Sequence, residues 1–160
     1  MLKFYFNGSP NPTKVALFLE EAGLAYEPVK VDTRKGEQFT PDYLKINPNG
    51  KIPAILDPNG PGGRPLPLFE SGAILQYLAE KTGKLLPQDA ARRYQAIQWV
   101  HFQMGGIGPM FGQVGFFNKF AGKDYEDKRP LDRYVAESRR LLQVLDDRLS
   151  DRQWIAGEYS

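Results

Sequence analysis

The amino-acid sequence predicts an α/β domain with a mixed four-stranded sheet, followed by an all-α domain. The N-terminal stretch alternates strand, helix and strand, which predicts a right-handed parallel unit. A Gly- and Pro-rich turn then separates two short apolar runs, which predicts an antiparallel hairpin. After residue 89 the apolar residues recur only at helical spacing, so helices alone are expected there.

The elements of the first domain follow from local patterns. The predicted strands, in chain order, are Leu2–Asn7, Tyr26–Val31, Pro53–Asp57 and Leu66–Phe69. The predicted helical segments are Thr13–Gly23, the short or irregular Gln38–Ile46, and Ser71–Thr82, whose expected inner face is Ala73, Ile74, Tyr77 and Leu78. Pro12 suits the first turn of its helix, and Gly23 suits a helix end. This order of elements is typical of a thioredoxin-like domain.

We therefore expect a thioredoxin-like domain over residues 1–83, a linker over 84–89 and an all-helical domain over 90–160. In the helical domain, Ala90–Phe102 is periodic, and the glycines and proline of 105–109 should kink or interrupt that helix. A phenylalanine-rich piece follows. Leu131–Leu149 is predicted as an amphipathic helix with an inner face of Leu141, Leu142, Leu145 and Leu149.

Composition excludes several classes of function. The 160-residue chain carries a formal charge of +2 with scattered basic residues, which argues against nucleic acid as a partner. No apolar run is long enough to span a membrane, and the N-terminus lacks a signal-peptide layout, so we expect a cytoplasmic protein. With no cysteine and one histidine, a protein thiol nucleophile and a metal site are not expected.

A candidate binding site lies between Asn49 and Ser71. An X-Pro bond at a strand start leaves the backbone of Ile52 free to pair with an extended ligand. The helix that begins at Ser71 offers unpaired N–H groups to a carboxylate. Together these features can hold a short acidic peptide.

The combination of Lys51-Ile52-Pro53 with Glu70-Ser71, in a thioredoxin-like domain followed by helices, resembles the cytosolic glutathione transferases over essentially the whole chain. The stretches 36–39, 69–75 and 105–110 resemble the bacterial nu class more narrowly. That class includes glutathione-dependent disulfide-bond reductases and is related to a prion-forming regulator of nitrogen metabolism. Family members continue for several helices beyond Ser160, so the resemblance implies that this chain is short at its C-terminus.

The resemblance implies a role for each part of the candidate site. A cis bond before Pro53 would turn the Ile52 N–H and C=O towards the cysteinyl backbone of glutathione. Ser71 and its helix end would take the γ-glutamyl carboxylate, and Glu70 the ammonium. The substrate-binding residues implied are Asn11, Gln38, Lys51, Ile52, Pro53, Glu70, Ser71 and Arg133. Lys51 and Gln38 would reach the glycine carboxylate or the cysteinyl backbone.

Ser9 and Asn11 are the candidate catalytic residues. Nu-class proteins have a hydroxyl residue here and an asparagine two positions on, which Ser9-Pro10-Asn11 matches. Lowering the pKa of a thiol near 8.5 by roughly two units requires ~3 kcal/mol of thiolate stabilisation, which such hydrogen bonds and a helix N-terminus can supply. An ordinary turn is the structural alternative. Tyr5 is the rival hydroxyl.

Arg133 has two interpretations. In nu-class proteins an arginine at the matching position reaches bound glutathione. A surface ion pair with Asp132 or Glu137 is the alternative, and the sequence does not separate the two.

The predicted function is that of a homodimeric, glutathione-dependent disulfide-bond reductase, with glutathione as cosubstrate and a small disulfide as the second substrate. Glutathione conjugation to electrophiles, as in detoxification, is an alternative that uses the same thiolate. A non-catalytic glutathione-binding regulator or scaffold is the other, because it needs the same pocket.

Overall fold

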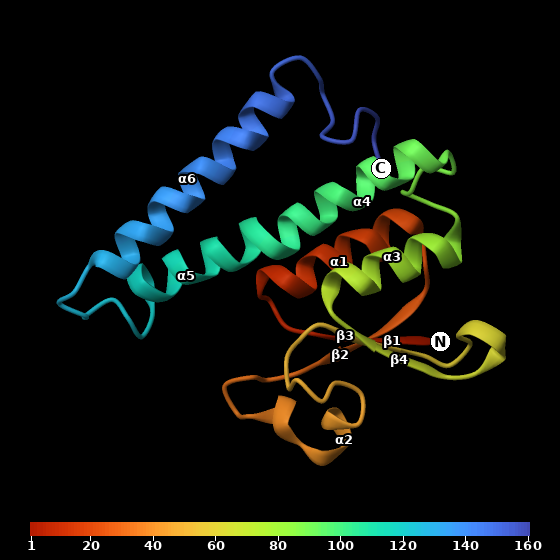
Figure 1. Cartoon of the computed structure of the whole chain (residues 1–160). Helices are drawn as coiled ribbons and strands as arrows, with labels where there is room; N and C mark the ends of the chain where they lie inside the picture. The colour runs from red at the N-terminus through yellow and green to blue at the C-terminus, as the bar shows by residue number, and fades with distance from the viewer. The chain divides into compact units, whose positions relative to one another are not determined.

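The computed structural model describes residues 1–160, which divide into two compact units, Met1–Leu85 and Leu86–Ser160. The first unit contains, in chain order, β1 (Leu2–Phe6), α1 (Pro10–Ala22), β2 (Tyr26–Lys30), η1 (Glu37–Phe39), α2 (Pro41–Leu44), β3 (Ala54–Asp57), η2 (Pro61–Gly63), β4 (Leu66–Phe69) and α3 (Ser71–Thr82). Figure 1 shows these elements as a sheet with α1 and α3 side by side along one face.

The four strands form one mixed sheet in the order β2-β1-β3-β4. β1 runs parallel to β2, whereas β3 is antiparallel to both β1 and β4. The predicted fold class, a thioredoxin-like α/β domain followed by helices, is therefore confirmed.

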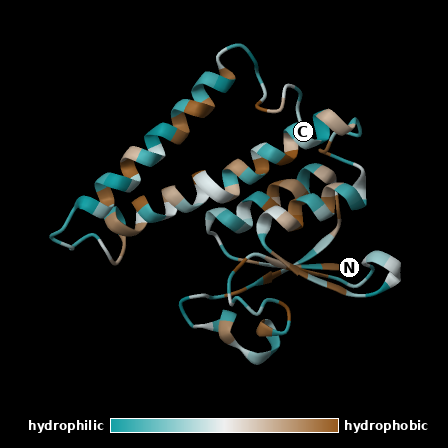
Figure 2. Cartoon of the chain, viewed as in Figure 1, coloured by the Kyte–Doolittle hydropathy of each residue, from teal (hydrophilic) through white to brown (hydrophobic).

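Two apolar clusters cover the sheet. The side chains at most 1% exposed between the sheet and the helices α1 and α3 are Phe4, Val15, Leu19, Ile55, Ile74 and Leu78. A second cluster consists of Val31, Tyr43 and Ala54, with Tyr5, Ile46, Ile52 and Phe69 packed against it. Figure 2 shows the corresponding apolar colour along the strands. Ala73, predicted on the inner face of its helix, is exposed instead.

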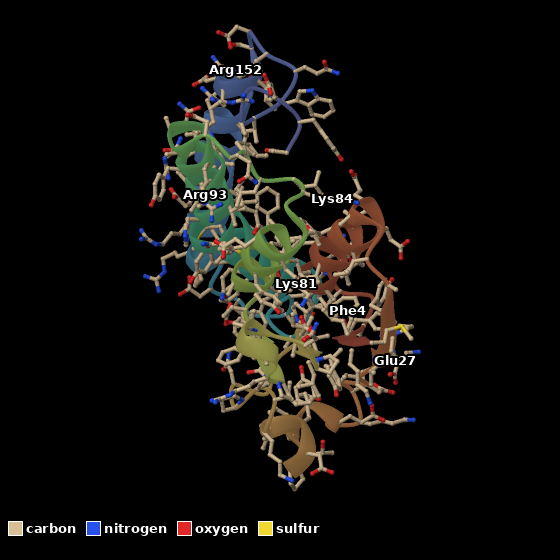
Figure 3. All side chains as sticks on the ribbon, turned by 90° about the vertical axis from the view of Figure 1, so that its right-hand side faces the viewer. Phe4, Glu27, Lys81, Lys84, Arg93 and Arg152 are labelled. Carbon is tan, nitrogen blue, oxygen red and sulfur yellow. The ribbon has the colours of Figure 1, made fainter.

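One charged residue of the core is fully paired. Asp57, at the end of β3, is 3% exposed. Its carboxylate accepts hydrogen bonds from the Tyr77 hydroxyl at 2.6 Å and from the Asn59 N–H at 2.9 Å, and lies 2.8 Å from Lys81 Nζ. Lys81, labelled in Figure 3, also donates to the Asn59 carbonyl. This network ties α3 to the end of β3 and to the turn after it.

The second unit contains α4 (Ala90–Phe102), the π-helix η3 (Gln103–Ile107), α5 (Gly108–Lys119) and α6 (Arg129–Leu149). The predicted interruption is a π-helix, and the backbone stays right-handed on both sides of it. Gly106 lies against α6, since a Cβ there would be 3.3 Å from the Leu141 side chain. Leu141 is 2% exposed, but Leu142 and Leu149, predicted on the inner face, are 48% and 42% exposed. No helix is both long and apolar enough to cross a membrane.

Replacement of Asp57 tests the network. Burial alone would raise the pKa of Asp57, but the bonds from Lys81, Tyr77 and Asn59 outweigh it, so the pKa is lowered. A carboxyl whose pKa is lower in the folded than in the unfolded state adds stability at pH values above its unfolded pKa. This stability is lost as the pH falls through the folded pKa. We expect Asp57→Asn to lower the free energy of unfolding at pH 7 by about 2 kcal/mol. The deficit relative to the wild type should shrink in acid, as measured by denaturation across pH.

Asp42→Asn is the matched control, because Asp42 pairs with Lys45 at the surface. Its effect should stay within about 0.5 kcal/mol. An equal loss in both variants, or a deficit for Asp57→Asn that does not depend on pH, would contradict the role given to the buried network.

Candidate functional site

A pocket of about 170 Å³ lies in the first unit, where three segments meet. It is lined by Asn11, Asn47, Asn49, Lys51, Ile52, Pro53, Glu70 and Ser71. The strand register explains the meeting, because Ala54 of β3 pairs with both Tyr5 of β1 and Phe69 of β4. Pro53 and Glu70 therefore emerge side by side at the sheet end from which the chain enters α1.

Two helix N-termini contribute to this pocket. Asn11 lies in the first turn of α1, and Ser71 is the first residue of α3. Ser71 is 5% exposed. A helix N-terminus presents unpaired N–H groups and a partial positive charge, so it favours anionic groups. The pocket is thus suited to a ligand with a carboxylate or a thiolate.

Glu70 has an unusual backbone. Its φ of 69° and ψ of 113° lie outside the regions that side chains normally allow. The surrounding structure imposes this geometry, because Phe69 is paired in β4 and the Glu70 carbonyl accepts the Ile74 N–H at 2.9 Å. Strained non-glycine residues concentrate at functional sites. The carboxylate of Glu70 is exposed and lies at the pocket.

The segment before β3 is held by side chains. The Ile52–Pro53 bond is cis, as the resemblance implies. The Lys51 carbonyl accepts two hydrogen bonds, from the Tyr43 hydroxyl at 2.5 Å and from Asn47 Nδ2 at 2.6 Å. The Ile52 N–H, by contrast, makes no backbone hydrogen bond within the chain. The pocket wall therefore offers one unpaired backbone donor.

The pocket carries both signs of charge. Lys51 and Glu70 line it. Lys14 of α1 lies within electrostatic range of Glu70. Partial burial lowers the pKa of Lys14, and the negative charge of Glu70 opposes this shift. Such a site suits a zwitterionic end group. No cluster of three or more His, Asp or Glu side chains is arranged to hold a metal ion.

Ser9 and Tyr5 occupy different surroundings. Ser9 is the residue before α1, and its hydroxyl makes no capping hydrogen bond. Asn7 holds this loop, since Asn7 Oδ1 accepts the Ser9 N–H at 2.9 Å and Asn7 Nδ2 donates to Thr33 Oγ1 at 3.2 Å. Tyr5 packs edge-to-face on Tyr43, 5.6 Å between ring centroids, and neither Ser9 nor Tyr5 lines the pocket.

Gln38 also lies outside the pocket lining. Its Nε2 donates to the Thr33 carbonyl at 3.4 Å, and its Oε1 is buried without a hydrogen-bond partner.

Arg133 is exposed on α6, in the second unit. The pKa of Glu137 is lowered mainly by its hydrogen bond from Arg140, and the charge of Arg133 adds to this effect. Contact of Gln38 or Arg133 with glutathione stays a prediction.

Sequence reasoning missed Asn47 and Asn49. Asn47 is 1% exposed and its Oδ1 accepts the Asn49 N–H at 2.9 Å. The available signal was the spacing of two asparagines around Pro48, directly before Gly50 and Lys51. Asparagine often bonds the backbone two residues on, so this pattern predicts a turn but not its closeness to a pocket.

These features define a class of protein: a thioredoxin-like domain whose pocket joins two helix N-termini and side chains of both charges, followed in the chain by a helical unit. The family model for the glutathione S-transferase N-terminal domain matches residues 1–80. The chain belongs to the glutathione S-transferase family, and the resemblance to its bacterial nu-like class is confirmed.

Among curated proteins, the chain is 49% identical to the disulfide-bond oxidoreductase YfcG of Escherichia coli, over 99% of this chain and 73% of YfcG. It is 37% identical to the E. coli disulfide-bond oxidoreductase YghU, over 98% of this chain but 55% of YghU. The chain thus spans little more than half the length of some curated relatives.

Among solved structures, a glutathione transferase from Pseudomonas putida with one glutathione disulfide bound per subunit is 67% identical, with a TM-score of 0.97. The match covers 99% of this chain and 69% of that one. A glutathione transferase from Burkholderia graminis with two glutathione molecules per subunit is 68% identical, with a TM-score of 0.96, over 99% of this chain and 67% of that one.

The turn before Lys51 offers a test of how tightly the pocket wall is packed. Gly50 has a φ of +60°, and a Cβ there would lie 2.8 Å from the Phe39 ring. Gly23 has a φ of +65° with open space around it. We expect Gly23→Ala to lower the free energy of unfolding by about 1 kcal/mol, because alanine is strained at a positive φ. Gly50→Ala should lower it by about 1 kcal/mol more, because the added methyl group also meets the Phe39 ring. Chemical denaturation measures both.

Phe39→Ala in the Gly50→Ala background should recover the additional cost, because it removes the ring that the new methyl group meets. If Gly50→Ala and Gly23→Ala were equally costly, or if the double variant recovered nothing, close packing of Phe39 on this turn would be disproved.

Proposed function

We propose that this protein binds glutathione in the pocket of its first unit and uses the glutathione thiolate to reduce disulfides. The observation that carries the proposal is the convergence of two helix N-termini and the unpaired Ile52 N–H on one pocket. A tripeptide with a charged amino-acid end, an extended backbone and a thiol matches these features. We also propose the cytoplasmic location and homodimeric state typical of the family.

Each end of glutathione has a proposed partner. The γ-glutamyl carboxylate is bound by Ser71 and the first N–H groups of α3, and the ammonium by the Glu70 carboxylate. The cysteinyl backbone pairs with Ile52, as an added strand pairs with a sheet edge. Lys51 and Gln38 are proposed to reach the glycine carboxylate or the cysteinyl backbone of glutathione.

Ser9 and Asn11 are proposed to stabilise the sulfur. Asn11 lines the pocket from the first turn of α1. Ser9 directly precedes that helix, and its hydroxyl makes no capping hydrogen bond to the helix N-terminus. Hydrogen bonds to a charged group each contribute about 1.5–3 kcal/mol, so two of them are enough to lower a thiol pKa by the roughly two units required. The protein itself needs no cysteine, because the substrate supplies the sulfur.

The proposed reaction is thiol–disulfide exchange. The bound thiolate attacks one sulfur of the disulfide substrate, forms a mixed disulfide and displaces the other sulfur as a thiolate. A second glutathione thiolate then attacks the glutathione sulfur of the mixed disulfide, which releases the reduced substrate and leaves glutathione disulfide. Relatives named disulfide-bond oxidoreductases, and a similar structure with glutathione disulfide bound, support this reaction.

Conjugation of glutathione to electrophiles is the second candidate, because the most similar structures described above are named glutathione transferases. It uses the same thiolate but ends in a thioether. Turnover of a model disulfide compared with turnover of an aryl halide separates the two reactions.

The γ-glutamyl site is tested by the double variant Glu70→Ala/Ser71→Ala. Loss of the charge-assisted bonds should raise the Kd for glutathione at least about 100-fold, as measured by calorimetric titration. Thr82→Ala, at the other end of α3, is the control and should leave the Kd unchanged, because its hydroxyl donates to the Leu78 carbonyl and accepts the Lys84 N–H, and Thr82 does not line the pocket. Wild-type affinity in the double variant would rule out this site.

The sulfur site is tested by Ser9→Ala and Asn11→Ala. Each change should raise the pKa of bound glutathione by about one unit, because it removes one hydrogen bond to the thiolate. The ultraviolet absorbance of the thiolate across pH reports this pKa. Disulfide turnover at neutral pH should fall more than affinity. Equal losses of turnover and affinity, with an unchanged thiol pKa, would reduce the residue to a binding contact.

A further inference from the structure

Two buried side chains, Tyr43 and the pocket-lining Asn47, converge on one backbone oxygen beside the pocket. The Lys51 carbonyl accepts the Tyr43 hydroxyl at 2.5 Å and Asn47 Nδ2 at 2.6 Å. A carbonyl oxygen has two lone pairs, so these bonds fill its capacity. Tyr43 and Asn47 are 5% and 1% exposed, so the two donor side chains are themselves buried.

The bonded carbonyl shares a peptide group with the Ile52 N–H. The only cis bond in the chain is Ile52–Pro53, so the peptide between Lys51 and Ile52 is trans. In a planar trans peptide the C=O and N–H point in opposite directions. Holding the carbonyl towards Tyr43 and Asn47 therefore turns the Ile52 N–H away from them. That N–H makes no backbone bond within the chain, and Ile52 lines the pocket.

We propose that Tyr43 and Asn47 are positioning residues that aim the Ile52 N–H into the pocket by fixing the carbonyl of the preceding residue. The part of this inference that concerns ligand affinity rests on the proposed glutathione site. The orientation of the peptide does not depend on it.

Both side chains are themselves held in place. Tyr43 belongs to the apolar cluster with Val31 and Ala54, and Tyr5 packs edge-to-face on its ring. Asn47 Oδ1 accepts the Asn49 N–H, which orients its amide so that Nδ2 faces the carbonyl. Burial raises the pKa of Tyr43 to about 12, so its hydroxyl remains a donor across the physiological pH range.

The arrangement gives the pocket a rigid donor. A peptide that must rotate to meet a ligand loses conformational entropy on binding, whereas a pre-aimed one does not. Removing the Tyr43 bond should therefore lower affinity without altering the pocket lining, because Tyr43 does not line the pocket.

The first test is free of ligand. Residual dipolar couplings report the orientation of individual N–H bonds in the full chain. In Tyr43→Phe/Asn47→Ala, the Ile52 coupling should change or its signal should broaden, while the couplings of β3 and β4 stay as in the wild type. An unchanged Ile52 coupling in the folded double variant would overturn the inference, whatever happens to glutathione binding.

The second test is calorimetric titration with reduced glutathione. Tyr43→Phe keeps the ring and removes one bond, so the Kd should rise about three- to tenfold, and the double variant should lose more. Tyr77→Phe is the matched control, because it removes a 2.6 Å bond to a buried acceptor in the same unit, away from the pocket. It should lower the Tm to a similar extent without changing the Kd.

The outcomes separate the two proposals. A reoriented Ile52 N–H with no glutathione binding, even by the wild type, would refute the proposed function and leave the positioning role supported. Equal Kd values for Tyr43→Phe and Tyr77→Phe, in a wild type that binds, would refute control of affinity by Tyr43. If the double variant fails to fold, Tyr43→Phe alone, which preserves the packing, decides the orientation by the same couplings.

Discussion

The antiparallel pairing of β3 with both of its neighbours is the constraint on which the candidate site depends. Ala54 pairs with Tyr5 on one side and Phe69 on the other, so one end of β3 brings together the loop that enters α1, the segment 51–53 and the start of α3. A slip of the register by one residue would turn every side chain of β3 to the opposite face. The buried positions of Ala54 and Ile55 on opposite faces make such a slip costly.

The two faces of the sheet contribute differently to this site. The cluster beneath α1 and α3 is almost entirely aliphatic and aromatic, and it holds the two helices whose N-termini reach the pocket. The cluster on the other face includes Tyr43, whose hydroxyl bonds the backbone directly before Ile52. The cluster beneath α1 and α3 thus positions the partial positive charges of the two helix N-termini, and the cluster on the other face orients the peptide group before Ile52. Both tasks depend on close packing, because neither a helix end nor a carbonyl has a defined direction in a loose core.

Stability and the candidate site are in partial conflict at Glu70. A non-glycine residue with a φ of 69° carries a conformational cost, and an exposed carboxylate gains little from folding. Strand pairing before it and the first helical bond after it hold the residue in this conformation. The Asp57 network at the opposite end of α3 adds stability there, with a buried carboxylate that is fully hydrogen-bonded. The strained and the stabilised ends belong to the same helix.

The sequence by itself determined the order of elements, the mixed sheet, the family and a short segment in which Ile52, Glu70 and Ser71 would form a site. Local signals suffice for these, because turn residues, strand alternation and helix caps act within a few positions. Only the tertiary structure decided that Asn47 and Tyr43 meet the Lys51 carbonyl, that Tyr5 packs rather than lines the pocket, and that Leu142 and Leu149 are exposed. Each of these outcomes depends on which segment, distant in the sequence, a residue packs against. Hydrophobic periodicity along one helix or strand carries no information about that packing partner.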